Sequence, residues 1–192
     1  GTFTSNIVKA ACVMWDKEIV ESGRKMQAVV VNSGIANACT GQEGYDACRK
    51  TAEAVDGALG VPADTVAVAS TGVIGQQIPI DKIVAGVTAL QPGLDGSLEG
   101  GARAARAIMT TDTFPKECAC EVTLVNGETV RIAGITKGSG MIAPNMGTML
   151  SFIVSDAVIP AKDIKKALKE AADVSFNMIV VDGDESTNDT CL

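Results

Sequence analysis

Residues 137–150 read Lys-Gly-Ser-Gly-Met-Ile-Ala-Pro-Asn-Met-Gly-Thr-Met-Leu and join a loop rich in glycine and proline to an apolar segment. The apolar segment, residues 148–154, has the composition of a β-strand, so Thr148 opens a strand directly after Gly147. One interpretation makes Thr148 a nucleophile that attacks the carbonyl carbon of Gly147, and cleavage there leaves Thr148 as a new N-terminus. The alternative is an ordinary joint between a loop and a strand, where threonine is common.

The chain contains no histidine, so neither a Ser-His-Asp triad nor a Cys-His pair can be built from its residues. A threonine hydroxyl is a poor nucleophile without a base. An α-amino group titrates near ~7.7–8.0, whereas an unperturbed lysine titrates near ~10.4. At neutral pH a useful share of an α-amine can therefore accept a proton. A Thr148 with a free α-amine would supply the base for its own hydroxyl.

Composition narrows the class of protein. With 192 residues, 46% of them hydrophobic and only 3% aromatic, the chain can bury one sizeable core in which helices pack closely on sheets. A net charge of −7 argues against a nucleic-acid partner. No run reaches the ~20 apolar residues of a membrane span, so we expect no membrane partner. Six cysteines without a CxxC pair, and without histidine, indicate no zinc site but reduced, mostly buried thiols in a cytoplasmic protein.

Hydrophobic periodicity predicts strands that alternate with helices, interrupted by one hairpin, and this favours an α/β or α+β layered domain. Around Asn126-Gly127 the alternation predicts a β-hairpin with a type I′ turn. The predicted strands are 7–13, 28–31, 65–70, 118–125, 128–135, 148–154 and 178–181; the predicted helices are 16–25, 42–59 with Gly60 as C-cap, 80–90, 94–109 and 161–174.

Several polar residues follow predicted elements and have two interpretations each. Thr71 and Gly72 end a strand, where a hydroxyl and a flexible amide can donate hydrogen bonds to an oxyanion or simply form a turn. Thr110 and Thr111 lie in a Met-Thr-Thr-Asp-Thr run that is either a substrate-facing loop or a helix cap. Lys137 either anchors a substrate carboxylate or is a surface lysine at the end of the hairpin.

Two further runs are rich in polar groups. In residues 32–41, which read Asn-Ser-Gly-Ile-Ala-Asn-Ala-Cys-Thr-Gly, a turn with asparagine side chains on local backbone groups is slightly favoured over a site lining. Residues 182–189 read Asp-Gly-Asp-Glu-Ser-Thr-Asn-Asp, but the sixth position is Thr187 where an EF-hand loop needs glycine. We expect this acidic loop to brace a site and to bind no calcium.

The run 137–150 resembles the self-processing motif of the ornithine acetyltransferases, also called bifunctional glutamate N-acetyltransferases, of arginine biosynthesis. That motif reads approximately Lys-Gly-x-x-Met-x-x-Pro-Asn-Met-Ala-Thr-Met-Leu, with cleavage just before the threonine. Every fixed position matches except Gly147, where alanine is usual. Other segments resemble the same family in the same order, and the resemblance covers essentially the whole chain: residues 3–11, 32–41, 70–75, 109–113 and 182–189.

The resemblance implies a four-layer α/β/β/α sandwich. It implies that Thr148 is the nucleophile, with cleavage between Gly147 and Thr148, and that Thr71 and Gly72 form the oxyanion hole. It also implies that the amino-acid substrate is bound by Lys137, by Thr148 and by one of two threonines, with Thr111 preferred and Thr110 not excluded.

The implied activity is acetyl transfer from N-acetylornithine to glutamate through an acetyl-Thr148 intermediate, without a metal or cofactor; some members also use acetyl-CoA as a substrate. Residues 1–147 would be an α-chain segment and residues 148–192 the start of a β-chain segment, both in one folded unit that self-associates as a heterotetramer. Members are about twice this long, so we expect the chain to be a fragment.

Two alternatives remain. The first is an amide hydrolase related to the self-cleaving aminopeptidases, in which water and not glutamate resolves the acyl-enzyme. The second is an unprocessed, non-catalytic scaffold. Exchange of acetyl between ornithine and glutamate distinguishes the transferase from the hydrolase, and an intact bond between Gly147 and Thr148 indicates the scaffold.

Overall fold

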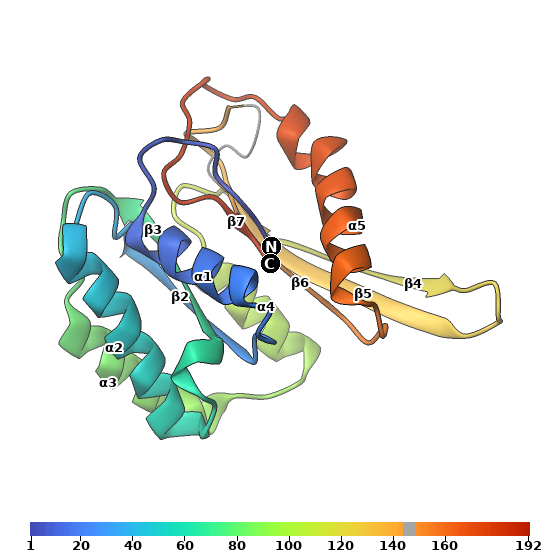
Figure 1. Cartoon of the computed structure of the whole chain (residues 1–192), viewed down its shortest axis with the longest axis horizontal. Helices are drawn as coiled ribbons and strands as arrows, with labels where there is room; N and C mark the ends of the chain where they lie inside the picture. The colour runs from blue at the N-terminus through green and yellow to red at the C-terminus, as the bar shows by residue number, and fades with distance from the viewer. Residues whose placement is uncertain (144–148) are drawn as a thin grey trace.

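The computed structural model describes residues 1–143 and 149–192, which form two β-sheets flanked by helices (Figure 1). The larger sheet has the strand order β1-β7-β6-β5-β4, and the smaller sheet pairs β2 with β3. The strands are β1 (Thr2–Phe3), β2 (Ala28–Ile35), β3 (Val66–Val73), β4 (Lys116–Thr123), β5 (Thr129–Lys137), β6 (Leu150–Ser155) and β7 (Thr190–Cys191). The helices are α1 (Ala11–Ser22), α2 (Gly41–Leu59), α3 (Ile80–Leu90), α4 (Leu98–Ala107) and α5 (Ala161–Asp173), with short 3-10 turns at Ala63–Thr65, Gln91–Gly93 and Phe176–Met178.

The smaller sheet is a parallel β2–β3 pair joined through α2. Both strands are rich in valine and alanine, as expected of strands that are covered by helices. Val68 packs in a cluster with the small buried side chains of α1 and the start of α2, among them Cys12 and Cys48. Val66 packs with Ala52 and Val55 of α2. Small side chains therefore let both helices lie close to one face of this sheet.

Side chains cover the edge of β3 that faces away from β2. The indole Nε1 of Trp15 donates to the Val66 carbonyl at 2.9 Å, the Val68 amide donates to Asp16 Oδ1 at 2.7 Å, and Asn188 Nδ2 donates to the Ser70 carbonyl at 2.8 Å. An exposed edge would offer these groups to another chain. Here three side chains, two from α1 and one from the segment before β7, take the place of a neighbouring strand.

The larger sheet takes strands from both sides of residues 144–148. β5 pairs antiparallel with β6, β6 pairs in parallel with β7, and β7 pairs antiparallel with β1. On one face, Leu168 of α5 and the nearby Phe176 pack against Met149 and Cys191. On the other face lies α4, whose Ala107 carbonyl accepts a hydrogen bond from Ser33 Oγ of β2 at 3.0 Å.

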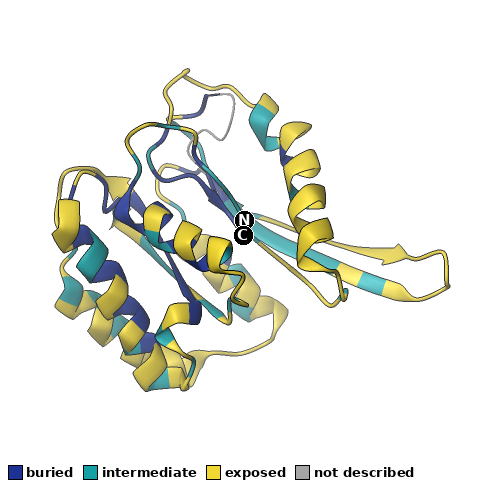
Figure 2. Ribbon diagram, in the orientation of Figure 1, coloured by how far each residue is buried: buried dark blue, intermediate teal, exposed yellow. Residues whose placement is uncertain are grey.

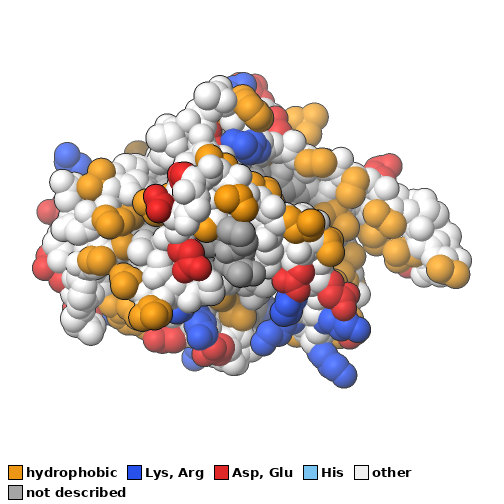
Figure 3. Space-filling model, turned by 90° about the horizontal axis from the view of Figure 1, so that it is seen from above, with side chains coloured by type: hydrophobic (Ala, Val, Ile, Leu, Met, Phe, Trp, Pro, Cys, Tyr) orange, Lys and Arg blue, Asp and Glu red, His pale blue; other side chains and the backbone are white. Residues whose placement is uncertain are grey.

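These contacts confirm the predicted mixed α/β class. Helices α1 and α2 cover the smaller sheet, α5 covers the larger sheet, and α4 lies between the sheets (Figure 1). Buried residues gather between α1, α2 and β3 and where the ends of the two sheets meet, whereas the tip of the β4–β5 hairpin and most of α5 are exposed (Figure 2). Apolar side chains reach the hairpin tip, where Val125 is fully exposed (Figure 3). Among the described residues, no helix combines the length and apolarity needed to cross a membrane.

Two predicted strands are wrong. Residues 7–13 do not form a strand, because α1 begins at Ala11 and its apolar positions continue at helical spacing to the buried Ile19. Residues 178–181 do not form a strand either, and Ile179, Val180 and Val181 are exposed. The place beside β6 is taken by β7, whose side chains are buried.

The other elements are confirmed with adjusted ends. Helix α3 has the predicted bounds, α2 ends at Gly60 in the left-handed conformation, and α4 is shorter than predicted. The hairpin is present, but its turn is not type I′. Within the turn, Gly127 has a positive φ and Asn126 does not, whereas a type I′ turn needs both. The Gly127 amide donates to the Leu124 carbonyl, and the Leu124 amide donates to the Glu128 carbonyl. This is a three-residue loop with glycine at the left-handed position.

All six cysteines are free. Cys12, Cys48 and Cys191 are buried and the other three are exposed, so the expectation of mostly buried thiols is correct for half of them.

We predict that Asn188→Ala lowers the free energy of unfolding by about 2–4 kcal/mol, because Asn188 Nδ2 donates to the buried Ala36 and Ser70 carbonyls at 2.5 and 2.8 Å. Urea denaturation measures the change. Gln42→Ala is the matched control, since that amide makes one exposed side-chain contact. Equal stability of the two variants would show that Asn188 does not hold the β3 edge.

Candidate active site

The end of β5 places Lys137 inside the protein with only 2% of the residue exposed. Its Nζ lies 2.7 Å from Thr110 Oγ1 and 3.2 Å from Thr71 Oγ1. A surface lysine at the hairpin end is therefore the wrong interpretation of this residue. The side chain points toward β3, and the preceding residue, Thr136, points to the opposite face of the sheet.

Asp112 connects this lysine to its surroundings. Its side chain is fully buried and accepts hydrogen bonds from Lys116 Nζ at 2.6 Å and from the Gly138 amide at 2.8 Å. The Thr110 amide donates to the other carboxylate oxygen, Oδ2, which lies 4.0 Å from Lys137 Nζ. The carboxylate thus ties the loop after α4 to the first residues of the run 137–150.

Burial and charge act on this cluster in opposite directions. Burial lowers the pKa of Lys137, and the negative charge of Asp112 opposes that shift. For Asp112, burial works to raise the pKa, but the hydrogen bonds from Lys116 and from the Gly138 and Thr110 amides outweigh it, and the pKa is lowered. Asp112 is therefore ionised at neutral pH and supplies the counter-charge for Lys137.

Thr71 and Gly72 lie at the end of β3. Thr71 is buried. Among the described residues, its hydroxyl oxygen accepts a hydrogen bond from Lys137 Nζ. Gly72 has a φ of 132°, and a Cβ placed there would lie 2.2 Å from the carbonyl carbon of Gly34 on β2. Only glycine fits this position, because the backbone angle and the close approach both exclude a side chain.

The structure brings Thr71, Thr110 and Lys137 together but leaves Thr111 apart. Thr110 Oγ1 accepts the shortest hydrogen bond of Lys137. Both Thr110 and Thr111 are exposed, but Thr111 takes no part in this hydrogen-bond network as far as the described residues extend. Of the two threonines left open by the sequence, Thr110 therefore belongs to the cluster.

The loop of residues 182–189 holds both flanks of the segment 144–148. The Met141 and Ile142 amides donate to the carboxylate of Asp182 at 2.6 and 2.8 Å. The Met149 amide donates to Asp189 Oδ1 at 2.8 Å. These contacts hold the backbone on both sides of that segment, whereas the expectation that the loop braces a catalytic site stays a prediction. Gly147 and Thr148, predicted as cleavage site and nucleophile, lie outside the described residues, so their roles stay predictions.

Asp189 is a member of the site that the sequence did not single out. The residue is completely buried, and its Oδ2 has no hydrogen-bond partner within residues 1–143 and 149–192. Burial raises its pKa to about 7. The sequence shows only that Asp189 is the last acidic residue of the loop 182–189. Its contact with the Met149 amide, 40 residues away, could not be predicted without the fold. Across the same described ranges, no group of three or more Cys, Asp or Glu residues could hold a metal ion.

The run 32–41 has the local contacts of a turn. Asn32 Nδ2 donates to the Ile35 carbonyl at 2.8 Å, and Asn37 Nδ2 donates to the Gly44 carbonyl at 2.9 Å. Thr40 Oγ1 donates to Asn37 Oδ1. The asparagine side chains therefore bond to local backbone groups as expected, but residues 32–35 are the end of β2 and not part of a turn, so the interpretation is only partly confirmed.

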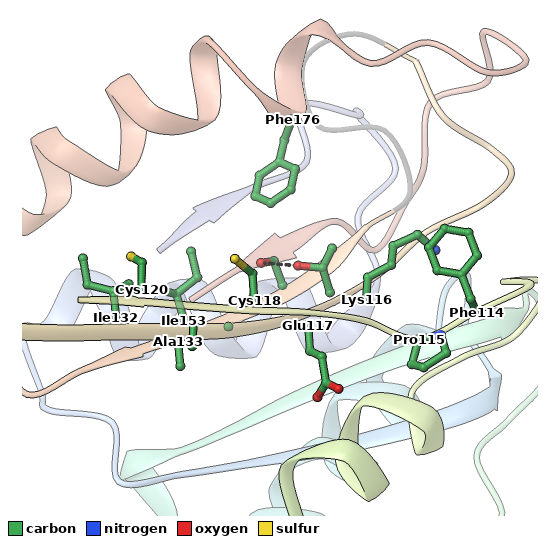
Figure 4. A pocket seen from close by; sticks show the side chains of 14 residues that line it. Phe114, Pro115, Lys116, Glu117, Cys118, Cys120, Ile132, Ala133, Ile153 and Phe176 are labelled. Atoms are coloured by element: carbon green, nitrogen blue, oxygen red, sulfur yellow. Dashed lines mark hydrogen bonds between the residues drawn. The ribbon is translucent and has the colours of Figure 1, made fainter. Parts of the chain in front are cut away.

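A hollow of about 580 Å³ lies on the face of the larger sheet opposite to Lys137 (Figure 4). Cys118 and Cys120 of β4 point into it on the side of Phe176. Thr136 and Ser151 also line it. Because β5 turns Thr136 toward this hollow and Lys137 away from it, the sheet separates the two. Lys116 connects the two, because it lines the hollow and its Nζ donates to Asp112.

The profile of the ArgJ family matches residues 1–192. The chain is 52% identical to the "Arginine biosynthesis bifunctional protein ArgJ" of Symbiobacterium thermophilum and 50% identical to the "Glutamate N-acetyltransferase" of Methanothermobacter thermautotrophicus. Each alignment covers all of this chain but 47% and 48% of the relative, so the chain spans about half the length of these curated relatives.

Solved structures agree. The crystal structure of ArgJ from Bacillus halodurans superposes with a TM-score of 0.69 at 39% identity, covering 78% of this chain and 75% of that one. The structure of ornithine acetyltransferase from Mycobacterium tuberculosis, complexed with ornithine, superposes with a TM-score of 0.68 at 44% identity, covering 78% and 76%.

We predict that Gly72→Ala lowers the free energy of unfolding by at least about 3 kcal/mol, since the methyl group meets the Gly34 backbone and the φ of 132° is strained for alanine. Thermal or urea unfolding measures this. Gly57→Ala in α2, where no atom lies within 4 Å, is the control and should be neutral or stabilising by about 0.5–1 kcal/mol. A Gly72→Ala protein as stable as the control would contradict the close β2–β3 approach.

We also predict that Asp189 makes stability depend on pH. Its pKa is raised from 3.8 to about 7 by burial, so its contribution to stability is fully present below pH 3.8 and is lost as the pH rises through about 7. From about pH 8 to about pH 5 the group adds about 2–3 kcal/mol, which Asp189→Asn removes. Urea denaturation at several pH values measures this, with the exposed Asp184→Asn as control. Parallel pH profiles of wild type and Asp189→Asn would refute it.

Proposed function

Because the chain belongs to the ArgJ family, we propose that the protein transfers an acetyl group from N-acetylornithine to the amine of glutamate through an acetyl-Thr148 intermediate. The observation that carries the proposal is the hydrogen-bonded cluster of the buried Lys137 and Thr71 with Thr110, at the start of the run 137–150. The names of the relatives add support: one is a glutamate N-acetyltransferase, and one structure contains ornithine.

Processing comes first in this proposal. Thr148 Oγ attacks the carbonyl carbon of Gly147, the peptide bond becomes an ester, and water hydrolyses the ester. The products are a carboxylate on Gly147 and a free α-amine on Thr148. We infer that both pieces remain together, because β5 on one side of the break pairs with β6 on the other and β1 pairs with β7.

In the transfer, the Thr148 α-amine takes the proton of its own hydroxyl while Oγ attacks the acetyl carbon of N-acetylornithine. The carbonyl oxygen becomes an oxyanion that accepts hydrogen bonds from the Thr71 hydroxyl and the Gly72 amide. Collapse breaks the acetyl C–N bond, and the departing amine of ornithine takes the proton. The amine of glutamate then attacks the acetyl ester, its proton returns to Thr148 Oγ, and N-acetylglutamate leaves.

The test measures cleavage and exchange in one preparation of the full-length protein. We expect a piece whose N-terminal sequence is Thr-Met-Leu, and transfer of labelled acetyl from N-acetylornithine to glutamate. Thr148→Ala should abolish both, and the exposed Thr129→Ala should leave both unchanged. Release of acetate with no acetylated glutamate would establish the amide hydrolase instead. An uncut, inactive wild type would establish the scaffold.

A further inference from the structure

Helix α5 carries a stripe of positive charge. Its lysines follow one another at the spacing i, i+3, i+4 and i+7, which places them on one side of the helix: Lys162, Lys165, Lys166 and Lys169. Like charges at these spacings repel one another and weaken a helix. The stripe is therefore unfavourable for the helix itself, and a group of opposite charge beside it would relieve the repulsion.

A hollow of about 570 Å³ lies between this stripe and the segment that holds β1 and the start of α1. Its volume is within the usual range for small-molecule sites. All four lysines of the stripe line it, and so do Lys9 and Lys17. Among the described residues of the lining, Asp173 is the one acid. Six lysines thus face one hollow in a protein whose net charge is −7.

Half of these lysines are neutralised by a carboxylate one turn further along the same helix: Lys17 by Glu21, Lys166 by Glu170 and Lys169 by Asp173. The other half keep their charge. Lys9 Nζ donates to the uncharged Asn6 carbonyl, and Lys162 and Lys165 have no ion pair in the described part of the chain. The hollow therefore favours an occupant with several negative charges.

Asn177 adds a second requirement. It lines the same hollow, and its Nδ2 donates to Asp173 Oδ1 at 2.8 Å, so the amide oxygen is the end left over. This oxygen, Oδ1, is buried and has no hydrogen-bond partner within residues 1–143 and 149–192. A buried acceptor without a donor is destabilising, and a hydroxyl or amino group on a ligand would supply the donor.

We propose that this hollow binds a small molecule that carries both a diphosphate group and hydroxyl groups, of which a nucleoside diphosphate is representative. A diphosphate concentrates several negative charges in one small group, and lysines bind phosphate oxygens as point charges. A hydroxyl of the same molecule donates to Asn177 Oδ1. Lys137, Thr71 and Thr110 do not line this hollow, and the proposal does not depend on acetyl transfer.

Isothermal titration calorimetry of the full-length protein with ADP, at about 0.15 M salt, tests the site. We expect saturable binding that is about tenfold weaker in the double variant Lys162→Gln/Lys165→Gln, because each contact between an exposed lysine and a phosphate is weak and two are lost. The matched control is Lys25→Gln/Lys50→Gln, which removes the same charge from exposed positions outside the hollow and should bind ADP like wild type.

A second ligand separates the charge from the hydroxyl contact. Inorganic tripolyphosphate offers negative charge without the hydroxyl groups of ADP. Asn177→Ala should therefore weaken ADP binding by about fivefold and change tripolyphosphate binding by less than about twofold. The lysine double variant should weaken both ligands. Equal effects of Asn177→Ala on the two ligands would refute the hydroxyl contact.

Three results would overturn the proposal as a whole. The first is ADP binding that does not saturate below about 1 mM in the wild type. The second is equal ADP affinity in the two lysine double variants. The third is tighter binding of citrate or of a single-stranded RNA oligonucleotide than of ADP, which would assign the hollow to a tricarboxylate or to nucleic acid instead.

Discussion

The buried ammonium of Lys137 is the constraint on which this part of the molecule depends. A charge removed from water must be surrounded by partners, and the partners of a lysine must be hydrogen-bond acceptors because its ammonium has only donors. The partners come from the end of β3, from the loop after α4 and from Asp112 beside them. Polar contacts therefore link the end of the smaller sheet to the end of β5.

Side chains of the acidic loop before β7, residues 182–189, form hydrogen bonds with backbone groups of other segments. Asn188 satisfies carbonyls at the edge of the smaller sheet, while Asp182 and Asp189 accept amides on either side of residues 144–148. Such a network is stabilising only when nearly all of its members are paired. Within residues 1–143 and 149–192 the Oδ2 of Asp189 is an exception, and burial raises the pKa of this carboxyl group in spite of the hydrogen bond from the Met149 amide.

Local patterns predicted local structure well. Helix α3, the end of α2 at Gly60 and the β4–β5 hairpin follow from periodicity and glycine placement. The same reasoning failed where distant residues decide. The apolar run of residues 178–181 reads as a strand, yet β7 takes the place beside β6. Composition favoured a surface position for Lys137, because the threonines that accept its hydrogen bonds are 27 and 66 residues away. Motif resemblance located those threonines without indicating the contacts.

The carboxylate contacts on either side of residues 144–148 are also compatible with the proposed self-cleavage. Cleavage between Gly147 and Thr148 would remove the only covalent link across that point, so the new N-terminus would depend on non-covalent contacts to stay near the cluster. The Met149 amide is held by Asp189, Ile142 is held by Asp182, and Gly138 is held by Asp112. None of these bonds involves the peptide that would be cut. A site that keeps its flanks on carboxylates from other segments can lose one peptide bond and still keep the groups on both sides of the break in place.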